Sequence, residues 1–306
     1  MPTLRVNDVT LAYEVLGNGP VVVWTPGGWF PRNEWAYLNA GCFCADYTSL
    51  LWDRRNSGLS DVAIDDAPSE FHLWADDLHA LLNALQMSPA YLAGGSAGNL
   101  FSLLMAHRYP ADVKGLILVG SPTNDLPLIG PLLEAHYLQL AEVAAKGMEA
   151  VISHSTDAWV RMAFAKAEPE DWLLNWVAAT IAVNPENHAR LLAMEPTKFA
   201  TLMKKWGNLG LDWASSKRFH LCGLSDEQVH QITAPALVIQ GFDELHPRQE
   251  AEELYRLLPN AAWVDFAHHY PQETIEQMAA SELLWHQQSF LSMPFIRQFL
   301  QRIESK

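Results

Sequence analysis

Hydrophobic and polar positions follow two different patterns along the first third of the chain. Residues 6–16 alternate with a period of two, whereas residues 21–24, 49–52 and 113–119 are short, continuous apolar runs. Alternation predicts a half-buried strand, and short apolar runs bounded by turn residues predict strands buried on both faces. Residues 71–85 instead place leucines at helical spacing. Strands that alternate with helices predict a mainly parallel sheet covered by helices on both faces.

The pattern changes in the second half of the chain and then returns. From residue 127 to residue 230 the spacing predicts helices and no strand. Apolar runs at residues 236–239 and 261–266 predict two further strands, with a helix at residues 248–258 between them. Residues 274–303 contain a long predicted helix.

These patterns predict an α/β core that is interrupted once. The core consists of residues 1–126 and 231–306, and residues 127–230 form an inserted helical lid. The chain has 306 residues, of which 49% are hydrophobic, which is enough for one large core with an insertion. Charged residues make up only 18%, and there are 12 tryptophans, so part of the apolar surface is available to line a pocket.

Charge and cysteine content exclude several classes of function. The formal net charge is −15, from 20 basic and 35 acidic residues without a basic run, which argues against nucleic acid and anionic membranes as partners. Cys42, Cys44 and Cys222 are an odd number without a C-x-x-C pair, which argues against a disulfide framework or a zinc site. We expect no metal or organic cofactor, a small-molecule substrate, and a soluble, cytoplasmic protein. A homo-oligomer is compatible with the sequence.

The strongest chemical signal is the sequence Gly-Gly-Ser-Ala-Gly at residues 94–98, a G-x-S-x-G pattern. A predicted strand at residues 91–93 enters it and a predicted helix at residues 100–107 leaves it. This context indicates a nucleophile elbow, a sharp turn that presents Ser96. Such a turn needs glycines because side chains there would collide with the neighbouring backbone.

A serine hydroxyl is a weak nucleophile unless a base removes its proton. The base is expected after the last strand, where His268 and His269 are adjacent. The imidazole in turn needs a carboxylate that fixes its tautomer. Asp243 is the first candidate because it closely follows the strand at residues 236–239, and Glu244 beside it is an alternative.

The oxyanion of a tetrahedral intermediate requires backbone N–H donors. One donor is expected to be the amide of Ala97, which follows the nucleophile. The second is expected from residues 25–29, after the strand at 21–24, where glycines let an amide face the site. Gly28 is the first candidate and Trp29 the second.

Together these segments resemble the α/β-hydrolase superfamily over essentially the whole chain. Residues 52–61, which read Trp-Asp-Arg-Arg-Asn-Ser-Gly-Leu-Ser-Asp, look like a loop of that family in which Asp53 and Arg54 brace the scaffold. The resemblance favours His269 as the base, because residues 269–273 look like the segment that follows the family's catalytic histidine. Pro247, four residues after Asp243, makes this segment similar to the loop that carries the acid in the family.

The resemblance also leaves alternatives and shows departures from the family pattern. Some members place the acid after the strand at residues 113–119, so Asp125 is a further candidate. Pro26-Gly27 stands where the family commonly has His-Gly, and neither candidate histidine follows a glycine. The order Ser96, Asp243 and a later histidine is the order expected of this fold.

The reaction that the resemblance implies is hydrolysis of a carboxylic ester or lactone of an apolar or aromatic small molecule. A C–C hydrolase of dienoic or β-diketone substrates is an alternative, as is an aminopeptidase similar to proline iminopeptidases. An aminopeptidase would hold the substrate ammonium with acidic lid residues such as Glu168, Glu170 and Asp171. A non-catalytic ligand-binding protein is the least favoured reading, because Ser, Asp and His are all present.

Overall fold

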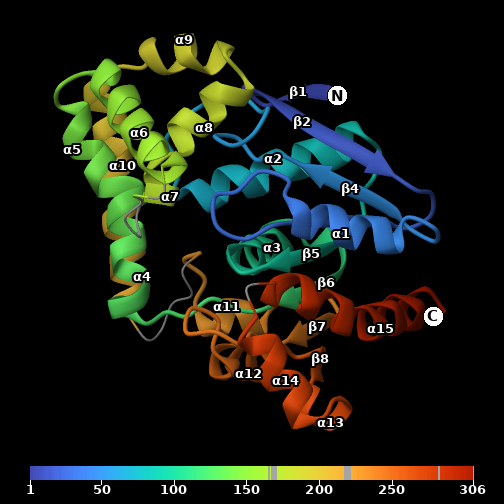
Figure 1. Cartoon of the computed structure of the whole chain (residues 1–306). Coiled ribbons are helices and arrows are strands. Elements are labelled where there is room, and N and C mark those ends of the chain that lie inside the picture. The colour runs from blue at the N-terminus through green and yellow to red at the C-terminus, as the bar shows by residue number, and fades with distance from the viewer. Residues whose placement is uncertain (165, 167–170, 217–221, 282, 306) are drawn as a thin grey trace.

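The computed structural model describes the whole chain except residues 165, 167–170, 217–221, 282 and 306. Its centre is an eight-stranded sheet with the order β1-β2-β4-β3-β5-β6-β7-β8 (Figure 1). The strands are β1 (Thr3–Val6), β2 (Val9–Leu16), β3 (Val21–Thr25), β4 (Thr48–Trp52), β5 (Ala90–Gly95), β6 (Val113–Val119), β7 (Ala236–Ile239) and β8 (Ala261–Val264).

Strands β3 to β8 form the parallel part of the sheet, and the N-terminal hairpin extends it by antiparallel pairing. β1 pairs with β2 and β2 pairs with β4, both antiparallel. The predicted strand at residues 6–16 is therefore shorter, because Asn7 adopts a positive φ of 50° and turns the chain between β1 and β2. The predicted mainly parallel sheet is confirmed.

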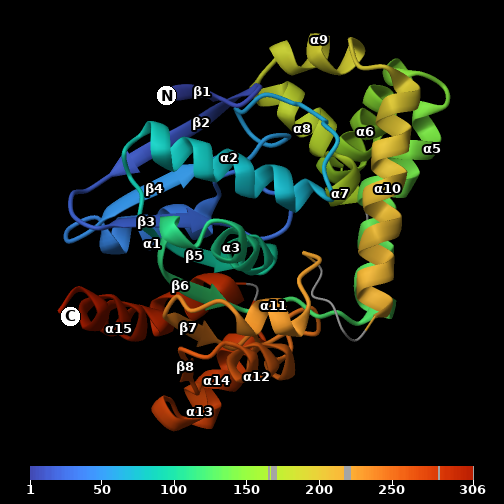
Figure 2. The ribbon, with the colours of Figure 1, turned by 180° about the vertical axis from the view of Figure 1, so that it is seen from behind.

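Helices lie on both faces of the sheet (Figures 1 and 2). The helices outside residues 126–215 are α1 (Glu34–Phe43), α2 (Glu70–Ala84), α3 (Ala97–Arg108), the 3₁₀ turn η1 (Pro110–Asp112), α11 (Asp226–His230), α12 (Arg248–Leu257), α13 (Phe266–His269), α14 (Gln272–Ala279) and α15 (Leu284–Glu304). One face packs against α2, α3 and α12, and the other against α1 and α15.

The continuous apolar runs supply both of these interfaces. Within β3, Val23 belongs to the cluster under α2 and α3, whereas Val22 and Trp24 belong to the cluster under α1 and α15. All three side chains are fully buried. Successive side chains of a strand point to opposite faces, so a strand covered on both sides must be apolar at every position.

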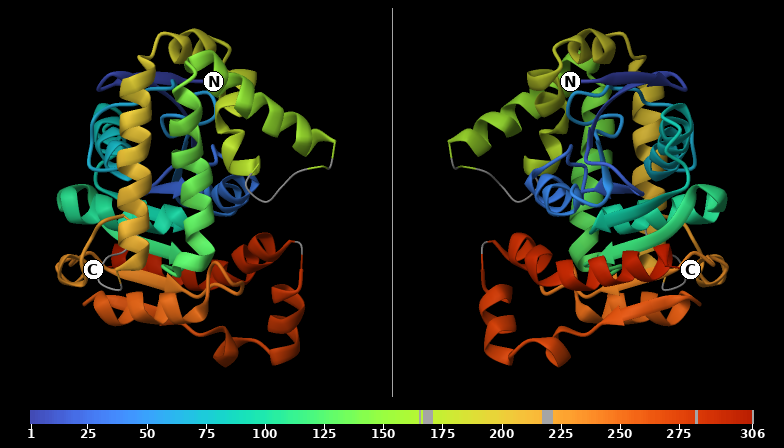
Figure 3. Two further views of the ribbon diagram at one scale, coloured as in Figure 1. Left: turned by 90° about the vertical axis from the view of Figure 1, so that its left-hand side faces the viewer. Right: turned by 90° about the vertical axis from the view of Figure 1, so that its right-hand side faces the viewer.

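A helical segment, residues 126–215, connects β6 to the final part of the core. It contains α4 (Leu126–Leu133), the π-helix η2 (Glu134–Gln139), α5 (Leu140–Ala144), α6 (Met148–Ala163), α7 (Asp171–Leu174), α8 (Trp176–Val183), α9 (Glu186–Leu192) and α10 (Pro196–Ser215). Figure 3 shows α10 alongside the α4–α5 run, with α6 projecting beyond them. The described residues between β6 and β7 contain no strand.

The predicted long helix at residues 274–303 is divided in two. α14 ends at Ala279 and α15 begins at Leu284, with α14 and α15 drawn as separate arms in Figure 3. The hydroxyl of Ser281 accepts a hydrogen bond from the Leu283 amide at 3.1 Å. This local bond competes with helical pairing, as serine side chains commonly do.

Candidate active site

Ser96 occupies the tight turn between β5 and α3. Its φ is 53°, a positive value that a residue with a side chain rarely adopts. A Cβ on Gly94 would lie 2.4 Å from the carbonyl of Gly98, and a Cβ on Gly98 would lie 2.4 Å from the carbonyl of Thr25. The two glycines are therefore required by close backbone approach, as expected of a nucleophile elbow.

Hydrogen bonds to Val119 of β6 hold the elbow in place. The Ser96 amide donates to the carbonyl of Val119 at 3.1 Å. The Asn99 side chain is fully buried; it donates to the same carbonyl at 3.0 Å and accepts from the Val119 amide at 3.1 Å. These bonds help to hold Ser96 in its positive-φ conformation.

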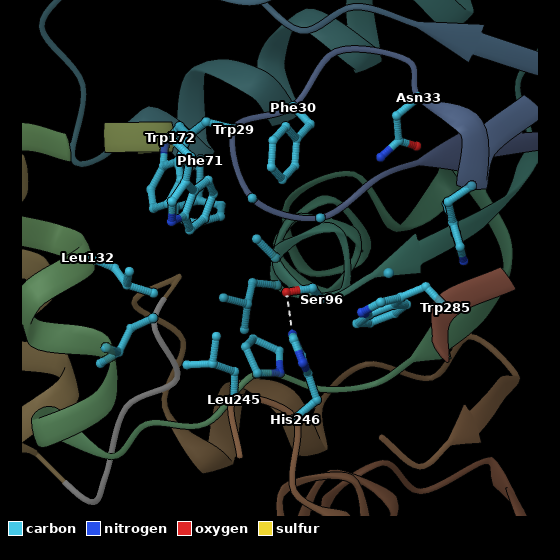
Figure 4. Close-up of a pocket in the computed structure, with 18 of the residues that line it drawn as sticks. Trp29, Phe30, Asn33, Phe71, Ser96, Leu132, Trp172, Leu245, His246 and Trp285 are labelled. Carbon is cyan, nitrogen blue, oxygen red and sulfur yellow. Dashed lines mark hydrogen bonds between the residues drawn. The ribbon is translucent and has the colours of Figure 1, made fainter. Parts of the chain in front are cut away.

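The histidine that contacts Ser96 is His246. Its Nε2 lies 2.8 Å from Ser96 Oγ (Figure 4), and its Nδ1 lies 2.7 Å from Asp243 Oδ1. The His246 amide also donates to the Asp243 carboxylate at 2.9 Å. Gly241 permits this turn, because a Cβ there would lie 2.2 Å from the His246 carbonyl. One loop after β7 therefore carries both Asp243 and His246.

The chemistry of the partners determines which nitrogen of His246 holds the proton. Burial raises the pKa of Asp243, but the side-chain and backbone hydrogen bonds from His246 outweigh it, and the net shift is downward. An ionised Asp243 only accepts hydrogen bonds, so Nδ1 is the donor. Nε2 is then the acceptor for the Ser96 hydroxyl, which is the tautomer that a general base needs. Trp285 packs edge-on against the imidazole, with ring centroids 4.9 Å apart.

The histidines expected from the sequence lie elsewhere, and this corrects the predicted base. His269 is exposed in α13, and its ring centroid lies 4.6 Å from that of Phe295. His268 is 80% exposed and pairs with Asp265 at 3.1 Å. The Asp265 side chain caps α13 by accepting a hydrogen bond from the Ala267 amide at 3.0 Å. Neither histidine contacts Ser96.

The alternative acids are also separate from this arrangement. Glu244 and Asp125 are exposed, and Asp125 stands at the N-cap of α4. Of the acidic residues considered for an aminopeptidase, Glu168 and Glu170 lie outside the described residues. Asp171 is buried and accepts a hydrogen bond from Arg161 Nε at 3.0 Å.

The loop after β3 approaches the nucleophile closely. A Cβ on Gly27 would lie 2.6 Å from the Ser96 Cβ, and Gly28 has a positive φ of 51°. Gly28, Trp29 and Ala97 line the same pocket as Ser96. Within the described part of the chain, the amides of Gly28 and Ala97 donate no backbone hydrogen bond. Both amides are therefore available as donors beside the serine hydroxyl.

Two fully buried charged side chains hold this loop in place. Arg54 donates to the Phe30 carbonyl at 2.7 Å, and burial lowers its pKa to about 10. Glu70 accepts from the Trp29 indole at 2.9 Å and from the Tyr137 hydroxyl at 2.9 Å. Burial raises the pKa of Glu70, but its hydrogen bonds and the charge of a nearby histidine outweigh it, so the net shift is downward. The carboxylate thus connects the loop to the helical segment.

Ser96 lines a mainly apolar cavity of about 300 Å³, which we call the Ser96 pocket. In Figure 4, Ser96 and His246 lie near the middle, with Phe71, Leu132 and Trp172 on one side and Asn33 and Trp285 on the other. The remaining lining residues are Gly27, Gly28, Trp29, Phe30, Glu34, Trp35, Gly95, Ala97, Leu100, Pro122, Ile129, Leu133, Leu245 and His286. The pocket therefore suits a largely uncharged small molecule.

Among the residues that the structure describes, no group of three or more metal-ligating side chains is found. In the same residues, no helix has both the length and the hydropathy that crossing a bilayer would require.

A signal for His246 was present in the sequence. The histidine stands three residues after Asp243 and directly before Pro247. This spacing allows both side chains to meet within one turn, but it contains no information about which histidine reaches Ser96.

Comparison with protein families identifies the class of this chain. Residues 20–271 match the family described as the alpha/beta hydrolase fold. The match covers most of the chain, so the protein belongs to this family, as the elbow and the sheet order indicate. The predicted fold class is confirmed.

Individual proteins that are similar to this chain share only a low sequence identity with it. Over 140 residues the chain is 29% identical to an uncharacterized hydrolase, YraK, of Bacillus subtilis (strain 168), and this match spans 46% of the chain and 49% of that relative. A thermophilic esterase from Thermogutta terrifontis has a similar structure, with a TM-score of 0.62, 20% identity and 99% of each chain covered. A meta-cleavage product hydrolase from Pseudomonas fluorescens IP01 aligns with a TM-score of 0.54, 17% identity, and coverage of 86% of this chain and 88% of that one.

Proposed function

We propose that this protein is a serine hydrolase that cleaves a carboxylic ester or lactone of an apolar or aromatic small molecule. The observation that carries the proposal is the hydrogen-bonded series Ser96–His246–Asp243, with distances of 2.8 and 2.7 Å, in which Ser96 and His246 line a mainly apolar pocket. These distances are those expected of a nucleophile, its base and the group that orients the base.

In the proposed mechanism, Ser96 Oγ attacks the carbonyl carbon while its proton passes to His246 Nε2. The carbonyl oxygen becomes an oxyanion that accepts hydrogen bonds from the amides of Gly28 and Ala97. The C–O bond of the ester then breaks, and the imidazolium returns the proton to the leaving alkoxide. Asp243 stabilises the imidazolium throughout. Water activated by His246 then attacks the acyl-enzyme and releases the acid.

In this proposal, the lid predicted at residues 127–230 forms part of the wall of the Ser96 pocket. Ile129, Leu132, Leu133 and Trp172 come from the helical segment and line the pocket. These side chains exclude water from the acyl-enzyme and favour an apolar substrate.

The first test is hydrolysis of p-nitrophenyl butyrate by the wild type and by Ser96→Ala, His246→Ala and His269→Ala. We expect the first two variants to lose at least about a thousandfold in kcat, in line with loss of a nucleophile or its base. His269→Ala is the matched control, because its imidazole is exposed and lies in α13, and it should retain activity. Loss of activity in His269→Ala with retention in His246→Ala would overturn the assignment.

A second measurement tests whether Ser96 is the nucleophile without depending on which substrate the protein cleaves. Diethyl p-nitrophenyl phosphate should phosphorylate Ser96 and release p-nitrophenol, with the adduct located by peptide mass spectrometry. Labelling without butyrate hydrolysis would support the nucleophile and redirect the substrate search to C–C hydrolase substrates. Absence of labelling and of hydrolysis would refute the serine hydrolase proposal.

A further inference from the structure

A second cavity of about 250 Å³ lies beside the Ser96 pocket. Trp29, Phe30 and Trp172 line both spaces, so these three side chains form a wall between them; they lie close to one another in the upper part of Figure 4. On the far side of the wall the cavity is lined by two more tryptophans, Trp159 and Trp176. We call this second space the aromatic cavity, defined by these five side chains.

The aromatic cavity has the chemistry of a site for an uncharged ring. No charged side chain lines it within the described residues. Its polar side chains already have partners: Thr180 donates to the Gly58 carbonyl at 3.2 Å, and Asn56 donates to Glu70 at 2.9 Å. The indole N–H of Trp176 is buried and has no partner in the described residues, and the side chain is only 7% exposed. A buried donor of this kind favours a ligand that brings an acceptor oxygen.

The wall between the two spaces adjoins the loop beside the nucleophile. Phe30 and Trp172 stack with centroids 5.4 Å apart and an interplanar angle of 16°. A Cβ on Gly28 would lie 3.2 Å from Phe30 and 3.6 Å from Trp172. Trp29 is held more firmly, because it is hydrogen-bonded to a buried carboxylate and stacked on His136 at 4.0 Å. The stacked pair thus lies beside Gly28, one of the two expected oxyanion donors.

We propose that the aromatic cavity is a substrate subsite that holds an uncharged one- or two-ring aryl group bearing an acceptor oxygen, with Trp176 as its hydrogen-bond donor. This inference rests on the proposed function: the ester carbonyl would lie at Ser96 and the aryl group in the aromatic cavity, which requires the stacked Phe30–Trp172 pair to separate when the substrate binds. An apolar cavity of about 150 Å³ is sufficient for benzene. The larger aromatic cavity therefore has room for a two-ring group.

Binding of non-hydrolysable ligands tests the subsite without any chemistry. By equilibrium dialysis, the wild type should bind 2-methoxynaphthalene about 5–10 times more tightly than naphthalene, the gain expected of one hydrogen bond. Trp176→Phe should remove this preference. Ala179→Phe fills the aromatic cavity without lining the Ser96 pocket and should weaken both ligands at least about tenfold. Ala193→Phe, at an exposed position of the helical segment, is the matched control.

Kinetics connect the cavity to the reaction. The ratio of kcat/KM for 2-naphthyl acetate to that for ethyl acetate should fall at least about tenfold in Ala179→Phe and remain unchanged in Ala193→Phe. An unchanged ratio in Ala179→Phe, or an unchanged ligand preference in Trp176→Phe, overturns the subsite. If the wild type hydrolyses neither ester but the ligands bind as expected, the proposed function fails and the ligand site remains supported.

Discussion

Replacement of Glu70 by glutamine tests whether this buried carboxylate holds the loop beside Ser96. Glu70 Oε2 accepts from the Trp29 indole and the Tyr137 hydroxyl, and Oε1 accepts from Asn56 Nδ2, each at 2.9 Å. A glutamine amide has one oxygen and one NH₂ group, so one of these positions must become a donor. If the NH₂ group faces Asn56, two donors oppose each other. Asn56 cannot simply flip, because its Oδ1 accepts from the Ala63 amide at 2.9 Å.

The expected loss of stability follows from the unsatisfied donor and the uncompensated charge. A buried donor left without a partner costs about 1–3 kcal/mol. Arg54 is fully buried, and among the nearby charges that of Glu70 contributes most to keeping it in the cationic form. Loss of this charge adds to the cost, with roughly 3–5 kcal/mol, the value for a broken buried ion pair, as an upper limit. We therefore expect Glu70→Gln to lower the free energy of unfolding by about 3 kcal/mol or more.

Urea unfolding followed by tryptophan fluorescence measures this loss. With a slope of about 3 kcal/mol/M, the midpoint should fall by about 1 M. Glu142→Gln is the control, because Glu142 is exposed in α5. The net pKa of Glu70 is lowered in the folded state, so its contribution is present at neutral pH and is lost as the pH falls through that pKa. The difference between the two variants should therefore narrow as the pH falls below 4.5, the ordinary pKa of a glutamate side chain. A midpoint within about 0.2 M of the wild type at pH 7 would refute this reasoning.

Three further predictions concern the site and its pH dependence. Asp243→Asn should lower kcat by about four orders of magnitude with KM little changed, because the imidazole loses its orienting acceptor; steady-state kinetics with a folded variant check this. Gly27→Ala should lower kcat/KM at least about a hundredfold, since the new Cβ would lie 2.6 Å from the Ser96 Cβ, whereas Gly41→Ala, with open space around it, should not. Burial lowers the pKa of His72 to about 4, so its contribution to stability is complete above about pH 6.5 and is lost as the pH falls toward 4. Thermal melts between pH 4 and 7 should show a shallower dependence for His72→Gln, and an equal slope would contradict the burial of a neutral imidazole.

The sequence predicted the sheet well because its signals are local. The continuous apolar run of β6, for example, requires two covering layers wherever it occurs. The glycines at 94 and 98 likewise indicate a close approach of the backbone, and the pattern that contains them is local in the sequence. The division between α14 and α15 was not predicted, because a single serine side chain can compete with helical pairing without altering the apolar period.

The histidine beside Ser96 was not predicted because its position depends on how a loop folds back. His246 reaches the serine through a turn that Gly241 permits, and no periodic pattern encodes such a turn. His269 follows the last strand, where the resemblance placed the base, but Asp265 caps a short helix there and leaves the imidazole exposed. The loop that carries Asp243 was predicted as a candidate region, and the histidine that contacts Ser96 lies three positions further along it.

Because Asp243 and His246 belong to one short loop, the proposed acid and base form a single mechanical unit. Motion of this loop relative to β5 would lengthen the His246–Ser96 hydrogen bond but leave the His246–Asp243 pair intact. The imidazole would then keep its tautomer during such motion, and only proton transfer from the serine would be interrupted. Protein engineers could graft the loop as one cassette, whereas an acid and a base on separate loops would have to be aligned independently.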